Sequence, residues 1–251
     1  MQTFGIYIIG DEILSGKRQD GHLSKAIEIL SARGLQLSWA QYLGDDPTQI
    51  TATLKTSFAK SGVEKENIVF SFGGIGATPD DYTRQAAADA LNMPIERHAG
   101  AVAEIVAQFG EGAYPKRVFM ADFPQGADLI PNPVNRVAGF SIQQHYFLPG
   151  FPQMAHPMME WVLDTHYSHL FHQTKYLEQS IIVVDGIESQ LIDLMNVVII
   201  AHDVKVFSLP KLKPNRQIEL GAKGAPDNVL QAIAALKTGV EKLGFAWRDF
   251  K

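Results

Sequence analysis

The sequence predicts an α/β protein, with a three-layer α/β/α domain built on a mostly parallel sheet and a small α+β domain after it. Over the first 90 residues, β-branched apolar runs alternate with amphipathic runs of helical period, the pattern of a parallel sheet covered on both faces. A glycine-rich segment, residues 73–81, follows the third apolar run. After about residue 172 the order of the predicted elements changes, which indicates a second domain.

Three strands and two helices are expected before the glycine-rich segment. The strands correspond to the short apolar runs at residues 4–9, 35–43 and 67–72. Leu23, Ile27 and Leu30 recur at helical spacing ahead of Gly34, a residue typical of helix ends. Asp46 followed by a proline is typical of a helix start, so the second helix is expected to begin there.

The rest of the first domain is expected to contain more helices and one hairpin. The helices are predicted around residues 86–91, 99–109 and 152–170. The hairpin, residues 139–148, returns to the sheet. A boundary near residues 171–175 gives two domains, 1–172 and 173–251.

The second domain shows its own pattern of elements. Strands are expected at residues 176–184, 204–209 and 217–220, and helices at residues 186–195 and 226–243. The aliphatic run at residues 197–201 has the length of a strand or a core segment. Residues 211–214 read as a solvated basic turn.

Composition excludes several classes of protein and of site. The net charge of −5 argues against nucleic acid as a partner, because phosphate backbones select basic surfaces. The absence of cysteine excludes disulfides, thiolate catalysis and cysteine zinc sites. No stretch approaches the roughly 20 apolar residues of a membrane span, and residues 1–5 do not begin a secretory signal. A cytoplasmic protein without a membrane partner is therefore expected.

The glycine-rich segment is the strongest signal for a ligand site. It lies between a predicted buried strand and a helix, at the carboxyl end of a parallel sheet, where open α/β folds hold ligands. Gly73, Gly74 and Gly76 let the backbone approach a phosphate, and the helix start offers free N–H donors. Asp80 and Asp81 would repel an anion unless a cation bridges them. The alternative is a simple turn with Asp80 as a helix cap.

A second acidic segment follows the first strand. Asp11 and Glu12 lie at the same expected sheet edge, so they are predicted to face the glycine-rich segment and to assist a metal or a water molecule. The alternative is an exposed acidic loop. Two further segments, residues 132–136 and 148–152, are Pro/Gly-punctuated and serve equally well as rigid turns.

Five segments together resemble a known family. They are GDEILSG (10–16), YLGDD (42–46), GGIGATPDDYTR (73–84), NPVNRVAGF (132–140) and LPGFPQM (148–154). Their order is similar to that in the N-terminal domain of CinA-like (competence/damage-inducible protein A) proteins, within the MoaB/Mog molybdopterin-binding superfamily. The resemblance covers roughly residues 1–170.

The resemblance implies a ligand and several activities. It implies a domain that binds a phosphorylated pterin such as molybdopterin, or a nucleotide, as a homo-oligomer (dimer or trimer). Some CinA-type domains hydrolyse the pyrophosphate of ADP-ribose-like nucleotides with a divalent metal, whereas Mog-type relatives adenylylate molybdopterin. The chain departs from the family pattern at several positions, namely Ile75, Ala77, His22, Asn135, Arg136 and Gln153.

The leading hypothesis is a divalent-metal-dependent (Mg, Mn or Co) nucleotide pyrophosphatase acting on ADP-ribose- or FAD-like substrates. Asp80 and Asp81 would hold the cation, and Asp81, Asp11 and Glu12 would carry catalysis. The ligand-binding residues would be Gly73, Gly74, Gly76, Thr78, Asp46, Asn132, Arg136, Pro149 and Gly150, with Arg136 able to fork onto a phosphate. A non-catalytic binding module and a molybdopterin adenylyltransferase are the alternatives, because all three would use the same anion-binding loops.

Overall fold

The computed structural model describes residues 2–60, 67–173, 177–211 and 216–250. The chain divides into two compact units, Met1–Phe171 and His172–Lys251. This division lies one residue from the domain boundary expected from the sequence. The predicted boundary segment and the predicted basic turn at residues 211–214 lie partly outside the described residues.

The first unit is built on a six-stranded sheet. Its strand order is β2 (Leu37–Leu43), β1 (Thr3–Ile9), β3 (Asn67–Phe72), β8 (His145–Leu148), β7 (Gly139–Ile142) and β6 (Asp128–Ile130). The first four strands run parallel to one another, and β7 pairs antiparallel with both β8 and β6. The predicted strands and hairpin are thus confirmed, and the hairpin joins the sheet beside β3.

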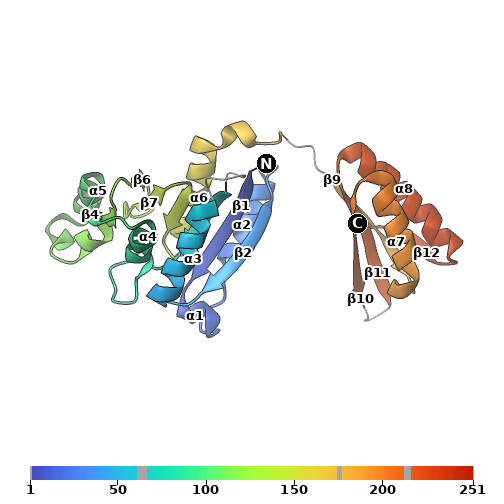
Figure 1. Cartoon of the computed structure of the whole chain (residues 1–251), viewed down its shortest axis with the longest axis horizontal. Coiled ribbons are helices and arrows are strands. Elements are labelled where there is room, and N and C mark those ends of the chain that lie inside the picture. The colour runs from blue at the N-terminus through green and yellow to red at the C-terminus, as the bar shows by residue number, and fades with distance from the viewer. Residues whose placement is uncertain (1, 61–66, 174–176, 212–215, 251) are drawn as a thin grey trace. The chain divides into compact units, whose positions relative to one another are not determined.

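Helices cover both faces of this sheet, as Figure 1 shows. On one face, a core of buried side chains joins the sheet to α3 (Pro47–Lys60), α4 (Thr83–Leu91) and α5 (Ala99–Phe109). On the other face, a separate core joins it to α2 (His22–Ser31) and α6 (Pro152–His166). The prediction of a three-layer α/β/α domain is confirmed.

Several short elements were not expected. The segment after β1 forms a one-turn helix, α1 (Asp11–Leu14), instead of an open loop. Two 3-10 turns follow α5, and the strand before that helix, β4 (Ile95–Arg97), pairs in a small ribbon with β5 (Asp122–Pro124), which follows the turns. A third 3-10 turn, Ser168–Leu170, takes the place of the last turn predicted for α6. Elements this short leave too few residues for a periodic pattern.

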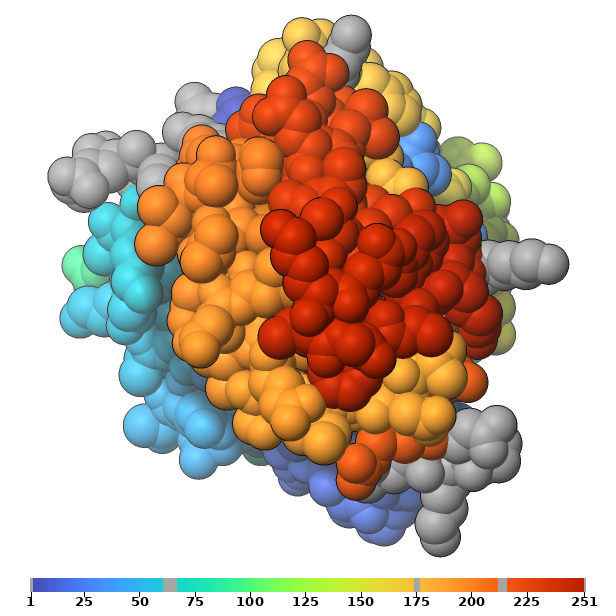
Figure 2. Space-filling model, turned by 90° about the vertical axis from the view of Figure 1, so that its right-hand side faces the viewer, coloured from blue at the N-terminus to red at the C-terminus, as the bar shows by residue number. Residues whose placement is uncertain are grey.

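The second unit is an antiparallel sheet with two helices. Its strands follow the order β10 (Lys205–Lys211), β11 (Gln217–Gly224), β9 (Leu177–Val184) and β12 (Ala246–Asp249). The helices α7 (Glu188–His202) and α8 (Pro226–Lys242) share one core with the sheet. Figure 2 looks onto this unit, with α7 in orange and α8 in red. The small α+β organisation expected for this part of the chain is observed.

The helix α7 is longer than the sequence predicts. It was expected to end at Met195 but continues to His202, through the aliphatic run at residues 197–201. Val198 is buried in the same core as Leu191, two helical turns earlier, and this packing outweighs the strand preference of β-branched residues. Within the described residues, no helix is long and apolar enough to cross a membrane.

Candidate functional site

The four parallel strands end at one edge of the sheet, beside α1 in Figure 1. The segments that follow them line two adjoining cavities of about 310 Å³ and 780 Å³. Glu12, Asp45 and Asp80 line both cavities. We call this pair of cavities the strand-end cleft. The sequence expectation that the segments at Asp11 and Asp81 meet at one edge agrees with this arrangement, since Asp11 lines the larger cavity and Asp81 the smaller.

The glycine-rich loop is held by close packing of its own backbone. Gly73 and Gly74 have φ angles of 103° and 70°, which glycine adopts without strain. A Cβ atom on Gly74 would lie 2.1 Å from the Thr83 hydroxyl, and one on Gly73 would lie 2.2 Å from the carbonyl oxygen of Ile9. The buried Thr83 donates its hydroxyl to the carbonyl of Gly73 at 3.0 Å. These glycines are therefore required by internal packing, whatever ligand the loop receives.

Asp81 closes the other end of the loop. Its Oδ2 accepts hydrogen bonds from the backbone N–H of Thr78 at 2.8 Å and from the Thr78 hydroxyl at 2.5 Å. The nearby Thr78 side chain and the backbone N–H of Asp80 itself hold the pKa of the Asp80 carboxyl below its ordinary value. Asp80 is exposed. In this structure Asp81 shapes the loop, whereas Asp80 projects its charge into the cleft.

Arg84 supports the loop from below and was not anticipated. Its Nη2 donates to the carbonyl of Gly76 at 2.6 Å, and its Nη1 donates to the carbonyls of Phe119 and Asp122. Burial lowers the pKa of this guanidinium below its usual range, and the nearby Asp122 and Asp81 counteract the shift. The arginine closes the quoted segment GGIGATPDDYTR, but sequence alone does not show that it turns inward.

The acidic side of the cleft is formed by α1 and the loop after β2. Asp11 and Asp45 bind each other's backbone: Asp11 N donates to Asp45 Oδ2 at 2.9 Å, and Asp45 N donates to Asp11 Oδ1 at 3.2 Å. Burial raises the pKa of Asp45, and the carboxylates of Asp11, Glu12 and Asp80 raise it further. Four carboxylates thus repel one another across a single cleft.

This donor set suits a hard divalent cation in kind, because Mg²⁺ and Mn²⁺ take oxygen ligands. The geometry is not preformed: no three His, Asp or Glu side chains of the described residues are arranged to hold a metal ion. His166 and His169 are exposed at the end of α6 and in the turn that follows it.

The basic residues of the cleft are Lys17 and Arg18, whereas the sequence predicted Arg136. Lys17 lines the larger cavity and Arg18 the smaller, and neither forms an ion pair with a described residue. Arg136 lies outside both linings, with both of its fork nitrogens on the carboxylate of Glu104 at 2.8 and 3.0 Å. The interpretation of Arg136 as a phosphate ligand is therefore corrected. The sequence feature that could have identified Lys17 and Arg18 is their position directly after the GDEILSG segment.

Asp46 and Asn132 also lie outside the lining of the cleft. Asp46 Oδ1 accepts from the backbone N–H groups of Thr48 and Gln49 at 2.8 and 3.1 Å, so it caps α3. Its neighbour Asp45 takes the place in the cleft. Asn132 is 4% exposed, and its side-chain NH₂ group donates to Asn135 Oδ1 and to the carbonyl of Val137, so this side chain fixes its own turn.

The third wall of the cleft is the turn after β8. Pro149 and Gly150 line the smaller cavity, as the ligand-binding prediction requires. Behind them His22, only 4% exposed, donates from Nε2 to the carbonyl of Gly150 at 3.2 Å and stacks on Phe72 with ring centroids 4.5 Å apart. Burial lowers the pKa of His22, so the ring is neutral at physiological pH. His22 therefore positions this turn, while Gln153 is exposed.

Comparison with known proteins places this architecture in a family. Residues 5–169 match the family described as "Probable molybdopterin binding domain". A "CinA-like protein" of Koribacter versatilis is 31% identical over 162 residues, which is 59% of this chain and 37% of that protein. A protein of Caldivirga maquilingensis is 29% identical over 236 residues, or 88% of each chain. The chain thus spans well under half of the CinA-like relative but most of the second one.

A solved structure shows the same fold. The protein CinA of Thermoplasma acidophilum superimposes with a TM-score of 0.57 at 24% identity, covering 65% of this chain and 98% of that one. The family match spans the parallel strands, the helices on both faces and the loops that line the strand-end cleft. The chain therefore belongs to the molybdopterin-binding domain family, with CinA-like proteins among its relatives.

Proposed function

We propose that the strand-end cleft binds a nucleotide or a phosphorylated pterin and, with a divalent cation, hydrolyses the pyrophosphate of an ADP-ribose- or FAD-like substrate. The observation that supports this proposal is the set of four carboxylates in one cleft, three of them facing the glycine-rich loop that carries the fourth, Asp80, with Arg18 beside them. Phosphates need donors and a cation to neutralise them, and the cleft offers backbone donors, basic side chains and cation ligands in one place.

In this proposal the acidic residues of the cleft hold the cation and the basic residues bind the phosphates. Asp11, Asp45 and Asp80 are the carboxylates placed to hold Mg²⁺, Mn²⁺ or Co²⁺, and they must move closer together to do so. Such a cation neutralises charge on the phosphate oxygens and lowers the pKa of bound water. Lys17 and Arg18 would pair with phosphate oxygens in the role first given to Arg136.

Glu12 is the group best placed to take the proton of the attacking water. It lines both cavities, and none of the described residues donates a hydrogen bond to its carboxylate. In the reaction, the water oxygen forms a bond to one phosphorus and its proton passes to Glu12. The bond from that phosphorus to the bridging oxygen breaks, and the bridging oxygen leaves with the electron pair on the second phosphate.

The test is release of AMP from ADP-ribose or FAD in the presence of Mg²⁺, Mn²⁺ or Co²⁺. Loss of a general base or a metal ligand reduces turnover by on the order of 100-fold or more, so Glu12→Gln and Asp45→Asn should both do so. Asp46→Asn is the matched control: it removes the same charge one residue away, outside the cleft, and asparagine also caps helices.

The proposal is abandoned if wild type and Asp81→Asn are equally inactive across the whole panel of substrates and metals. Equal loss in Asp45→Asn and Asp46→Asn would also contradict it, since the effect would then come from charge alone or from the fold.

The rival function is a binding module without turnover. The absence of a preformed metal group among the described residues favours this alternative. It predicts calorimetric binding of ADP-ribose or molybdopterin, weakened by Arg18→Gln, with no AMP released in any metal. Formation of adenylylated pterin from ATP and molybdopterin would instead indicate adenylyl transfer.

A further inference from the structure

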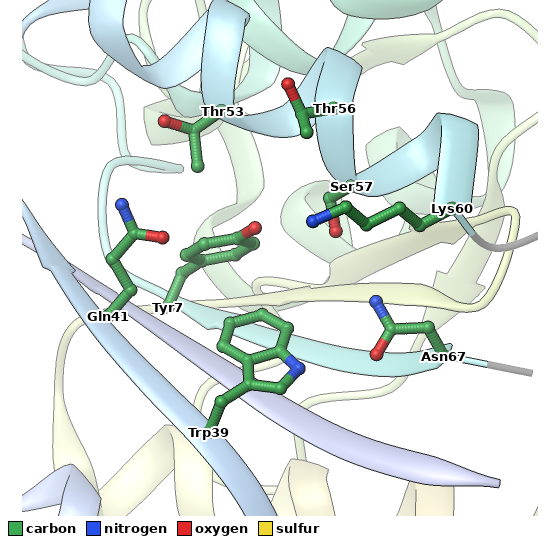
Figure 3. Close-up of a pocket in the computed structure, with 8 residues that line it drawn as sticks. All are labelled: Tyr7, Trp39, Gln41, Thr53, Thr56, Ser57, Lys60 and Asn67. Atoms are coloured by element: carbon green, nitrogen blue, oxygen red, sulfur yellow. The ribbon is translucent and has the colours of Figure 1, made fainter. Parts of the chain in front are cut away.

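A second cavity of the first unit lies away from the strand-end cleft, between α3 and the face of the sheet (Figure 3). Its volume is about 360 Å³. It is lined by the face of β1 and β2, by α3 and by the first residue of β3, namely Tyr7, Trp39, Gln41, Thr53, Thr56, Ser57, Lys60 and Asn67. None of these residues lines the strand-end cleft. We call this space the α3 cavity.

The floor of the α3 cavity is an aromatic platform. The rings of Trp39 and Tyr7 have centroids 5.0 Å apart at an interplanar angle of 58°. The indole lies over Gly5 of the neighbouring strand, where a Cβ atom would come within 2.0 Å of the ring. Because Gly5 has no side chain, the indole of Trp39 packs flat against β1 and is half-buried. Such a platform offers a ligand a flat apolar face on which to stack.

A chain of buried hydrogen bonds fixes the polarity of the hydroxyl of Tyr7. His145 is neutral, since burial lowers its pKa to about 4. Its Nδ1 lies 2.9 Å from the carbonyl of Gln143, which can only accept, so Nδ1 carries the proton. Its Nε2, 2.8 Å from Ser57 Oγ, then accepts the proton of the serine. The serine oxygen is thus left as acceptor for Tyr7, with which it also bonds.

The consequence is a defined pattern of donors and acceptors facing the α3 cavity. The O–H group of Tyr7 donates inward to Ser57, and the lone pairs of its oxygen can accept a hydrogen bond from a ligand. Asn67 accepts from the hydroxyl of Thr3 through Oδ1 at 3.2 Å, and in Figure 3 its NH₂ group points toward the side of the cavity where Lys60 lies. In Figure 3 the side chain of Lys60 extends over the cavity, and among the described residues of the lining it is the single charged one.

We infer that the α3 cavity binds a small planar heteroaromatic molecule that carries an anionic or carbonyl oxygen. The ring stacks on Trp39, its oxygen accepts from Lys60 and Asn67, and a ring N–H donates to Tyr7. The volume lies at the small end of the roughly 300–1,000 Å³ of ligand pockets, so the ligand is a single heterocycle rather than a dinucleotide. This site is separate from the cleft of the proposed function and does not depend on it.

Urate is a suitable probe, because it is a planar bicycle with carbonyl oxygens and a negative charge at neutral pH. Calorimetric titration of the full chain with urate should show saturable binding. Trp39→Leu removes the stacking surface and should weaken it about tenfold. Lys60→Gln should weaken it about three- to fivefold, since the amine is exposed, and should remove the preference for urate over neutral hypoxanthine.

Lys55→Gln is the matched control, because Lys55 is an exposed lysine of the same helix that does not line the cavity. Thr53→Met fills the cavity from α3 and should abolish binding even if Trp39→Leu disturbs the fold. Glu12→Gln in the strand-end cleft should leave urate binding unchanged.

The inference is overturned if folded wild-type protein shows no binding heat at millimolar urate. It is equally overturned if Lys60→Gln and Thr53→Met bind urate like wild type, or if Glu12→Gln abolishes binding, since the probe would then occupy the other cleft.

Discussion

At the scale of single residues, buried histidines make the protein sensitive to acid. His145 is fully buried, both ring nitrogens have partners, and burial lowers its pKa from 6.5 to about 4. The folded state therefore binds fewer protons than the unfolded state between these two pH values, and stability falls as the pH is lowered through this window. Well above pH 6.5 the ring is neutral in both states and contributes no pH dependence.

We expect the free energy of unfolding to decrease by about 1.4 kcal/mol for each pH unit below 6.5, and by on the order of 3 kcal/mol in total by pH 4, from His145 alone. Urea denaturation at a series of pH values measures this slope. His145→Gln should lower stability yet flatten the slope, whereas His169→Gln, at an exposed site, should leave it unchanged. An equal slope in wild type and His145→Gln contradicts the prediction.

Two glycines with similar φ angles allow the cost of backbone strain to be distinguished from the cost of a steric clash with a neighbouring side chain. Gly74 and Gly126 have φ angles of 70° and 77°, so alanine at either position meets the same unfavourable conformation. A Cβ atom on Gly126 would meet nothing within 4 Å, but one on Gly74 would collide with Thr83. Gly126→Ala should therefore cost about 1 kcal/mol of unfolding free energy, and Gly74→Ala clearly more. Chemical denaturation of the two variants measures the difference, and equal losses would exclude a role for the Thr83 contact.

At the scale of elements, the period of the hydrophobic residues was sufficient to predict the sheet of the first unit and the helices that cover it. The runs at β1 and β3 are short, apolar and bounded by glycine or polar residues, so strand and loop could be assigned without an alignment. The same reasoning placed the loops at Asp11 and Asp81 at one edge, because parallel strands end together. It could not foresee α1 or β12, whose four residues each carry too little pattern.

The site was predicted less completely than the sheet, because side-chain direction in a loop depends on local hydrogen bonds. Asp45 and Asp46 are adjacent and identical in type, yet the cap of α3 turns one away and leaves the other in the cleft. Arg136 was predicted to bind a phosphate, but in the structure it forms an ion pair with Glu104, which is distant in sequence. Arg84 was not predicted as part of the site, because the residues around it in the sequence do not indicate that its guanidinium is buried.

The cap of α3 gives a prediction at this scale. Asp46→Ala removes the acceptor for two backbone N–H groups and should lower the free energy of unfolding by about 1 kcal/mol. Asp46→Asn should retain most of that stability. Thermal or urea unfolding compares the three proteins, and a loss of the same size in both variants would mean that charge at the helix start, rather than the cap bond, is responsible.

At the scale of the whole molecule, each unit has its own hydrophobic core. The first unit packs its helices on both faces of its sheet, and the second unit packs α7 and α8 on one face of another. A fragment of residues 1–173 should therefore fold alone, with a cooperative thermal transition and the ligand binding of the full chain. Circular dichroism and calorimetry test this. A fragment without a cooperative transition would show that the second unit is needed for folding.

Assembly stays a prediction. A homo-oligomer, dimer or trimer, is expected from the resemblance to the MoaB/Mog superfamily. Multi-angle light scattering gives the mass directly, and a value near the 27.7 kDa of one chain at micromolar concentration contradicts the expectation.

The place of β8 in the sheet also decides when the fold can be completed. This strand lies beside β3 in the middle of the sheet, although α4, α5 and the β7 strand separate the two along the chain. Until residue 148 has left the ribosome, β3 is an edge strand whose side chains, all buried in the finished fold, have only part of their cover. The sheet and the third wall of the cleft can therefore be completed only after residues 145–150 have been synthesised, and until then the edge of β3 is open to pairing with another chain.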